Sequence, residues 1–306
     1  MQGLVIKSTG SWYNVLGDDG HKYECRIKGK LRMKGLVSTN PVAVGDRVDF
    51  ELEPDQETAV ISNIHDRKNY IIRKSINLSK QVQIIASNLD LACLVVTLAS
   101  PRTSLGFIDR FLVTAEAYGV PAVLIFNKLD LFNEEGIEIL GNYMDMYEGI
   151  GYPCFAVSAV KGTHIEILEA VIKDKISLFS GHSGVGKSSL INRLIPGKEL
   201  RVGQISESSD MGKHTTTFAE LFELPFGGKL IDTPGIRELG ITDISKEELG
   251  HFFPEMRKLM HDCKFNNCVH INEPGCAVLK ALDDGELEPT RYDSYQSIYF
   301  GNNTRG

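Results

Sequence analysis

The sequence predicts a multi-domain α/β protein with a small N-terminal β-barrel, a central domain built on a parallel sheet, and a C-terminal helical domain. Short strand-like segments fill about the first 65 residues, and apolar strands then alternate with helical segments. After residue 240 the pattern becomes helical and contains a Cys/His cluster. The length of 306 residues suits two or three domains.

The N-terminal segments predict a five-stranded barrel, for which the OB-fold is the best description. Turn-like sequences at residues 17–20 and 53–55 separate segments with the composition of strands. These segments are residues 4–6, 13–16, 23–27, 47–52 and 59–64. Five short strands in so short a stretch are typical of a small closed barrel.

The central region predicts strands that alternate with helices, which indicates a mainly parallel sheet covered on both faces. A helix is expected over residues 104–118, with Ser104 as its N-cap. The expected strands are residues 91–98, 122–126, 154–157, 176–179 and 229–231.

Charge and cysteine content limit the class of protein. The net charge is -7, but residues 1–80 carry 13 basic and 10 acidic side chains while residues 81–306 carry 20 and 30. An acidic total therefore restricts where nucleic acid can bind without excluding it. Six cysteines are too few for a disulfide scaffold, and the chain begins without the apolar run of a signal peptide. We expect a cytoplasmic protein without membrane segments.

A phosphate-binding loop is predicted at residues 181–188, where the sequence matches G-x-x-x-x-G-K-[ST] between a strand and a helix. Its glycines let backbone N–H groups surround phosphates, Lys187 reaches the β- and γ-phosphates, and Ser188 ligates Mg²⁺. The nucleotide contacts assigned here are Gly181, His182, Ser183, Gly184, Val185, Gly186, Lys187, Ser188 and Ser189.

Two further segments are expected at the γ-phosphate. Asp232 follows a strand and is placed to hold Mg²⁺ through water, while the N–H of Gly235 meets the γ-phosphate. Thr216 is our choice for a Mg²⁺ ligand and catalytic threonine, although the sequence does not separate it from its two threonine neighbours. The position where many GTPases carry a water-orienting Gln holds Ile236, which has no hydrogen-bonding group. His214 is the candidate for that role; the alternative is an RNA contact or a loop residue without chemistry.

Residues that select guanine are predicted after two apolar strands. Asp130 accepts the two N–H donors on the guanine edge, a pair that adenine lacks. Asn127 braces the loop and the stem of Lys128 covers the base plane. Ser158 and Ala159 form a second loop, in which the N–H of Ala159 meets guanine O6.

The C-terminal cluster offers three thiolates and one imidazole, the ligand set of a closed, structural Zn²⁺ site. Its members are Cys263, Cys268, His270 and Cys276, and His261 is the rival to His270. Cys25, Cys93 and Cys154 lie in apolar strands and are expected to be buried thiols. Tyr292, Tyr295 and Tyr299 fall at helical spacing; packing is the preferred interpretation and stacking on RNA the alternative.

The order of the motifs is unusual, because the base motifs precede the phosphate loop. This order indicates a circularly permuted GTPase, in which the Asp232 loop runs almost directly into the C-terminal domain. With the N-terminal barrel and the Cys/His cluster, the chain resembles the ribosome-small-subunit-dependent GTPase A family along essentially its whole length. We place the domains at residues 1–68, 69–241 and 242–306.

The resemblance implies a GTPase that uses GTP, GDP and Mg²⁺, carries one structural Zn²⁺ on the four ligands, and acts in late maturation of the small (30S) ribosomal subunit. It also implies that the subunit stimulates hydrolysis and that basic side chains contact 16S rRNA. Candidates are an alternating row and a junction group: Arg26, Lys28, Lys30, Arg32 and Lys34, and Arg67, Lys68, Arg73 and Lys74. We expect a monomer. Two alternatives stay open: a GTP-gated RNA-binding checkpoint and a metabolic P-loop kinase.

Overall fold

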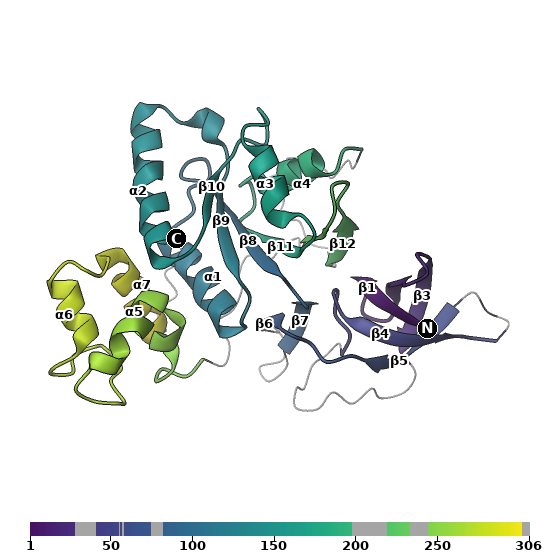
Figure 1. Cartoon of the computed structure of the whole chain (residues 1–306), viewed down its shortest axis with the longest axis horizontal. Helices are drawn as coiled ribbons and strands as arrows, with labels where there is room; N and C mark the ends of the chain where they lie inside the picture. The colour runs from purple at the N-terminus through teal and green to yellow at the C-terminus, as the bar shows by residue number, and fades with distance from the viewer. Residues whose placement is uncertain are drawn as a thin grey trace, which may run out of the picture.

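The computed structural model describes residues 1–27, 41–54, 56, 58–74, 82–197, 219–232 and 244–301. The barrel and the C-terminal domain lie at opposite ends of the central domain (Figure 1). Among the helices in these ranges, none is both long and apolar enough to cross a lipid bilayer.

Five strands form the N-terminal barrel: β1 (Gln2–Ser8), β2 (Tyr13–Gly17), β3 (Lys22–Ile27), β4 (Arg47–Leu52) and β5 (Thr58–Ile64). Their order is β1-β2-β3-β5-β4, and β4 also pairs with β1, so the barrel closes. Alternate side chains point inward and are fully buried, among them Val5, Val15, Phe50 and Ile61. The predicted five-stranded barrel is confirmed, with strand ends within two residues of those expected.

The hairpin of β6 (Tyr70–Lys74) and β7 (Val82–Ser87) follows the barrel and was not predicted. Ile72 and Ile84 pack with Ala43 of the barrel side and Tyr118 of the central domain. The hairpin therefore fills the junction between two domains, and its position depends on partners distant in sequence.

The central domain contains a six-stranded sheet in the order β10-β9-β8-β11-β13-β12. Its strands are β8 (Leu91–Val96), β9 (Ala122–Phe126), β10 (Cys154–Ala156), β11 (Ile176–Ser180), β12 (Glu220–Glu223) and β13 (Lys229–Asp232). All pairings are parallel except that of β12 with β13. The mainly parallel sheet is confirmed.

Helices cover both faces of this sheet: α1 (Leu105–Ala117), α2 (Glu134–Ile150), α3 (Ile165–Ile172) and α4 (Lys187–Leu194). The six residues of β8 are buried, and alternate ones enter different cores. Leu94 packs with α1 and α2, whereas Cys93 packs with α3 and α4. Ser104 caps α1 as predicted, because its hydroxyl accepts the N–H of Phe107 at 3.3 Å.

The barrel joins the central sheet edge to edge, since β1 pairs antiparallel with β12 at Lys7 and Glu220. The ammonium of Lys7 also lies 3.4 Å from the carboxylate of Glu220. Barrel and central sheet therefore form one continuous sheet of eleven strands.

The C-terminal domain is helical, with α5 (Pro254–Leu259), α6 (Ala277–Asp283), α7 (Pro289–Tyr299) and the short 3-10 turns η2 (Leu249–Phe252) and η3 (Met260–Asp262). Leu249, Phe253, Met256 and Tyr295 form a separate core, which Val113 of α1 joins. The domain thus has its own apolar interior and rests on α1.

Candidate nucleotide site and metal centre

The predicted nucleotide motifs meet at one edge of the sheet. The phosphate loop follows β11, the Asn127 motif follows β9, the Ser158 motif follows β10, and Asp232 ends β13. The carboxyl ends of parallel strands lie on the same edge, which is where open α/β sheets bind ligands. The fold therefore assembles the predicted loops from four strands.

Two glycines of the phosphate loop occupy positions where a side chain would collide with a neighbouring motif. Gly181 has φ +143°, and a Cβ there would lie 2.2 Å from the carbonyl oxygen of Val95. Gly186 has φ +91°, and its Cβ would lie 2.3 Å from Nδ2 of Asn127. The glycine spacing thus lets the loop approach β8 and the base motif closely.

Lys187 is the first residue of α4, and its ammonium turns back into the loop. It donates to the carbonyl oxygens of Gly181 and His182, the latter at 3.0 Å. Burial lowers the pKa of Lys187, and the negative charge of Asp232 opposes that shift. A phosphate in the loop would replace these carbonyls as the partner of the ammonium.

Asn127 connects three motifs through its buried amide. Its Nδ2 donates to the carbonyl oxygen of Val185 in the phosphate loop at 2.8 Å, and its Oδ1 accepts the N–H of Ala159 at 3.1 Å. The side chain is 1% exposed. These two hydrogen bonds support the bracing role expected of Asn127, whose contact with a nucleotide stays a prediction. The N–H of Ala159 is occupied here, so its contact with guanine O6 stays a prediction.

Asp130 is exposed to solvent at the rim of these loops. The hydroxyl of Ser158 donates to Oδ1 of Asp130. The Ser158 hydroxyl also accepts the N–H of Lys161 at 3.0 Å, which fixes the orientation of the serine. The guanine contact of Asp130 stays a prediction.

One further loop, residues 97–103, was not predicted; it follows β8 and contacts both the base motif and the phosphate loop. The ammonium of Lys128 donates to the carbonyl oxygen of Ser100 at 2.5 Å. A Cβ at Gly184 would lie 3.3 Å from Cδ of Pro101. The Thr97 hydroxyl donates to the carbonyl oxygen of Pro101, and the N–H of Thr103 donates to the carbonyl of Thr97 at 2.8 Å. The only sequence signal was a polar Ser-Pro step directly after an apolar strand.

Several predicted residues lie outside the described ranges, namely His214, Thr216 and Gly235. The same holds for Lys28, Lys30, Arg32 and Lys34 of the basic row. Ser188 and Ser189 lie in the first turn of α4, and their phosphate and Mg²⁺ contacts stay predictions.

Two members of the junction group, Arg67 and Lys68, are paired with carboxylates, which corrects the prediction for Arg67. The Arg67 guanidinium contacts the carboxylate of Asp46 at 2.5 Å, with side chains 7% and 0% exposed. Asp46 also accepts the hydroxyl of Ser87 at 2.6 Å. Lys68 pairs with Asp90 at the surface. Arg67 therefore stabilises the barrel junction instead of contacting RNA.

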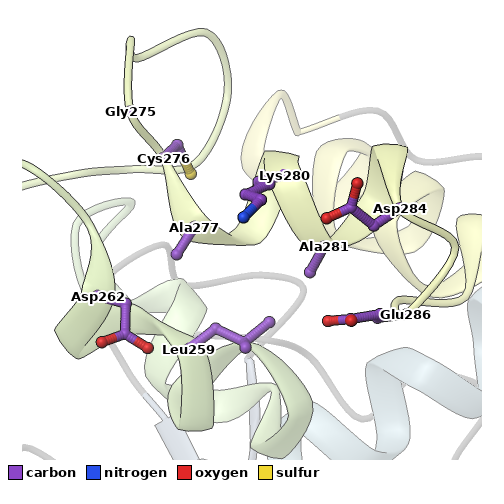
Figure 2. Close-up of a pocket in the computed structure, with 9 residues that line it drawn as sticks. All are labelled: Leu259, Asp262, Gly275, Cys276, Ala277, Lys280, Ala281, Asp284 and Glu286. Carbon is purple, nitrogen blue, oxygen red and sulfur yellow. The ribbon is translucent and has the colours of Figure 1, made fainter.

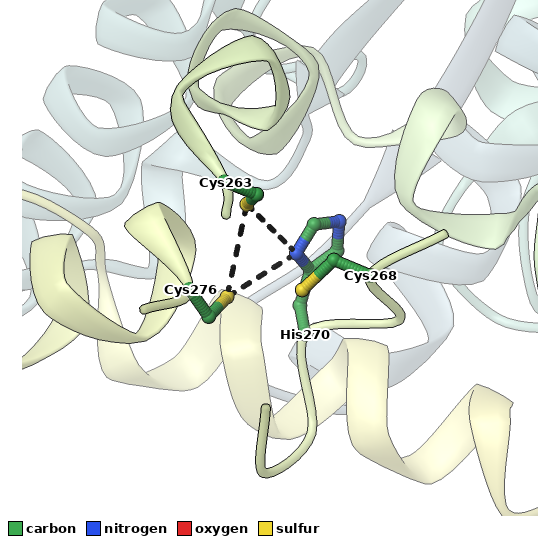
Figure 3. Close-up of side chains that lie close together, drawn as sticks. All are labelled: Cys263, Cys268, His270 and Cys276. Atoms are coloured by element: carbon green, nitrogen blue, oxygen red, sulfur yellow. Dashed lines mark hydrogen bonds between the residues drawn. The ribbon is translucent and has the colours of Figure 1, made fainter. Parts of the chain in front are cut away.

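The four predicted metal ligands converge in the C-terminal domain (Figure 3). The Sγ atoms of Cys263 and Cys276 lie 4.0 Å apart, and Nδ1 of His270 lies 3.7 Å and 3.3 Å from them. Zinc–sulfur bonds of about 2.3 Å place tetrahedral sulfurs roughly 3.8 Å apart. The donor set and spacing fit one Zn²⁺ ion. His261 is 73% exposed and pairs with Asp262, so it is not the fourth member of this cluster.

Buried tyrosines of α7 hold the loop that carries two of these ligands. The hydroxyl of Tyr292 donates to the carbonyl oxygen of His270 at 2.8 Å, and that of Tyr295 to Val269 at 2.5 Å. Both rings are buried in the domain core and Tyr299 packs against it. The packing interpretation of the three tyrosines is confirmed.

The face between η3 and α6 contains a hollow of about 450 Å³ (Figure 2). Its rim carries the carboxylates of Asp262, Asp284 and Glu286 and one ammonium, from Lys280. These carboxylates would repel a phosphate backbone at the hollow itself.

The fold and the loops define the class of protein: a P-loop GTPase in which the strands that carry the base motifs precede the strand that carries the phosphate loop. Residues 64–242 match the RsgA GTPase family, and residues 2–61 match the RsgA N-terminal domain. The chain belongs to the RsgA GTPase family, whose members hydrolyse GTP.

Curated relatives and solved structures agree with this family assignment. The small ribosomal subunit biogenesis GTPase RsgA of Flavobacterium psychrophilum is 53% identical over 98% of this chain and 93% of its own. The small ribosomal subunit biogenesis GTPase RsgA 2 of Bacteroides thetaiotaomicron is 54% identical over 97% of this chain and 96% of its own. YjeQ from Thermotoga maritima superposes with a TM-score of 0.79 at 36% identity, over 100% of this chain and 99% of that one. YloQ, described as a circularly permuted GTPase, superposes with a TM-score of 0.74 at 30% identity, over 100% of this chain and 96% of that one.

Proposed function

We propose that this protein binds guanine nucleotides at the edge of its central sheet and hydrolyses GTP on the small (30S) ribosomal subunit during late maturation of that subunit. The observation that carries the nucleotide assignment is the Asn127 amide, which joins the base loops to the phosphate loop. The relatives named for small-subunit biogenesis support the choice of target.

The individual roles follow from position and chemistry. Asp130 selects guanine, Lys187 neutralises charge on the β- and γ-phosphates, and the backbone N–H groups of the phosphate loop bind phosphate oxygens. Ser188, Thr216 and Asp232 hold Mg²⁺, which neutralises charge developing on the phosphates when bound. His214 orients the attacking water.

The domains have separate tasks, with proposed boundaries at residues 1–68, 69–241 and 242–306. The barrel contacts 16S rRNA through its basic row. Arg26 of this row pairs with Glu53 at 2.5 Å while its side chain is 49% exposed, so it remains accessible to a phosphate. The Cys263, Cys268, His270 and Cys276 cluster binds one structural Zn²⁺. We further propose that the protein acts in the cytoplasm as a monomer.

A GTPase assay with purified small subunits, large subunits and neither tests the proposal. Small subunits should accelerate phosphate release many-fold over the free enzyme, and large subunits should not. A Lys187→Ala variant should abolish the stimulated rate. Equal rates in all three conditions would refute the assignment of the small subunit as target.

One observation favours a second function, a GTP-gated RNA-binding checkpoint in which hydrolysis only resets binding. The barrel pairs through β1 with β12, whose neighbour β13 ends at Asp232. A barrel attached to this edge of the nucleotide domain can respond to the bound nucleotide. Subunit affinity measured with GDP and with a GTP analogue, beside single-turnover rates, separates the two. A large affinity difference with slow turnover favours the checkpoint.

A further inference from the structure

Helix α1 contacts the nucleotide loops at its first turn. The ring of Phe107 lies against that of His182 in the phosphate loop, with centroids 3.7 Å apart and planes inclined by 34°. The loop that leads into α1 supplies two more contacts, between Ser100 and Lys128 and between Pro101 and Gly184. The start of α1 is therefore attached to both halves of the nucleotide site.

The following turns of α1 hold the C-terminal domain. The Arg291 guanidinium of α7 contacts Oδ1 of Asp109 at 2.6 Å and the carboxylate of Glu255 at 2.7 Å. Tyr147 donates its hydroxyl to the same Asp109 oxygen at 2.9 Å. The Arg291 and Asp109 side chains are 0% and 1% exposed. We call Asp109, Arg291 and Glu255 the interdomain clamp.

Two pairs at the edge extend this contact along α1. Arg110 donates to the hydroxyl of Ser297 at 3.3 Å, and Arg257 donates to Glu116 at 3.0 Å. The C-terminal domain therefore contacts α1 through polar pairs from Asp109 to Glu116. The first of these contacts, at Asp109, lies two residues after Phe107, whose ring meets the phosphate loop.

The chemistry of the clamp favours one docking geometry over others. It buries one guanidinium with two carboxylates, and Nη2 of Arg291 and Oε2 of Glu255 have no hydrogen-bond partner among the described residues. Buried charges gain little net stability, but removing one partner is strongly destabilising because the other charge stays buried. The clamp fixes the position of α7 on α1, and any displacement of α1 must move α7 or break the clamp.

We propose that α1 couples the nucleotide site to the C-terminal domain, so that docking of the domain raises nucleotide affinity and nucleotide binding tightens docking. Phe107, Asp109 and Arg291 are positioning residues in this scheme. This coupling runs through α1. It therefore differs from a coupling in which the chain after Asp232 connects the nucleotide site directly to the C-terminal domain. The coupling rests on the proposed nucleotide site, and reciprocity follows from linkage of the two equilibria.

A double-mutant cycle in the full chain tests the coupling, with Mg²⁺·GDP as probe. Arg291→Ala should weaken GDP binding about fivefold to tenfold. Phe107→Ala removes the contact with the phosphate loop and leaves the clamp intact. In that background, Arg291→Ala should change GDP affinity less than about twofold, because the ring contact through which α1 itself meets the phosphate loop is already removed and the remaining contacts belong to the loop before the helix. Leu105→Ala is the matched control, since it removes an apolar side chain from the same turn of α1 and leaves the contact between Phe107 and His182 in place.

Hydrogen exchange of α7 supplies the second measurement. GDP should slow exchange of residues 289–299 in the native chain and in Leu105→Ala, and should have no such effect in Phe107→Ala. This comparison needs no clamp variant, so it remains decisive if Arg291→Ala does not fold. Additive effects in the cycle, or GDP-induced protection of α7 in Phe107→Ala equal to that of the native chain, would overturn the coupling. Failure of the native chain to bind GDP would instead refute the nucleotide site.

Discussion

The side-chain amide of Asn127 donates to the carbonyl oxygen of Val185 at 2.8 Å, which joins residues 58 positions apart. Asn127 follows β9 and Val185 belongs to the phosphate loop after β11, so the bond spans β8 between them. A single buried amide thereby sets the spacing between the base-binding and phosphate-binding loops. Under the proposed function this spacing must match the length of one nucleotide.

Replacing Gly186 by alanine should disrupt this connection. The new Cβ would lie 2.3 Å from Nδ2 of Asn127, so the amide must move and lose Val185. We expect GDP affinity to fall by about tenfold or more, since the lost bond is buried and worth roughly 1–3 kcal/mol. Equilibrium GDP binding measures the change.

Gly197→Ala provides the matched control for this substitution. Gly197 has a similar φ of +87° against +91°, but a Cβ there meets nothing within 4 Å. Both variants therefore carry comparable backbone strain, and only one carries the collision. Equal losses of GDP affinity in the two variants would show that backbone strain, not the Asn127 contact, governs binding.

Asp130→Asn should exchange guanine for xanthine specificity. The carboxylate of Asp130 accepts hydrogen bonds from two guanine donors. An Asn amide would face those guanine N–H groups with an N–H of its own, which is unfavourable, whereas the same N–H can donate to the carbonyl of xanthine. We expect GDP affinity to fall by at least about 100-fold and xanthosine diphosphate to bind better than GDP. Asp174→Asn, a carboxylate away from these loops, should leave GDP binding unchanged. Retained preference for GDP in the Asp130 variant would contradict the assignment.

Metal content should distinguish the two candidate histidines. His270 is 1% exposed with Nδ1 facing two sulfurs, whereas His261 points to solvent. His261→Ala should retain one Zn²⁺ per chain, and His270→Ala should bind less Zn²⁺ and lower the stability of the C-terminal domain. Elemental analysis with thermal unfolding measures both effects. Loss of Zn²⁺ from the His261 variant would contradict the four-ligand site.

His214→Ala should slow small-subunit-stimulated hydrolysis by about 100-fold without changing GDP affinity, because a water-orienting group acts only in the chemical step. Steady-state rates with saturating subunits test this, beside equilibrium GDP binding. Full stimulated turnover in the variant would remove His214 from the reaction. A parallel loss of GDP affinity would indicate a structural effect instead.

Alkaline pH should destabilise the fold through its buried thiols. Burial in the barrel core raises the pKa of Cys25 from 9.0 to about 12. Below pH 9 the thiol is neutral in both folded and unfolded chains. Between pH 9 and about 12 only the unfolded thiol ionises, so the stabilising contribution is lost as pH rises, by up to about 1.4 kcal/mol per pH unit.

Cys25→Ala isolates this contribution in denaturant unfolding at pH 8, 9 and 10. The variant is less stable at pH 8 because it loses a buried side chain, but its stability should decline less steeply with pH. The other buried thiols remain in both chains, so they cancel in the comparison. Identical pH slopes for the two proteins would show that Cys25 does not contribute.

The sequence by itself determined the elements with strong local signals. Alternating apolar residues and turn residues defined the barrel strands, and Ser104 marked the start of α1. The phosphate loop, the Asn127 motif and the Cys/His cluster were recognisable because their chemistry depends on residue type at short, fixed spacing. The order of these motifs also indicated the circular permutation, since motif order is a property of the chain itself.

Only the tertiary structure decided which of these groups meet, and with what partners. It paired Arg67 with Asp46, removing this side chain from the RNA-binding candidates. It selected His270 over His261 and placed the β6–β7 hairpin between two domains. Contacts such as Asp109 with Arg291 join residues 182 positions apart, and no local pattern encodes them. Burial and charge pairing depend on how distant segments pack, so they arise only when the complete fold brings those segments together.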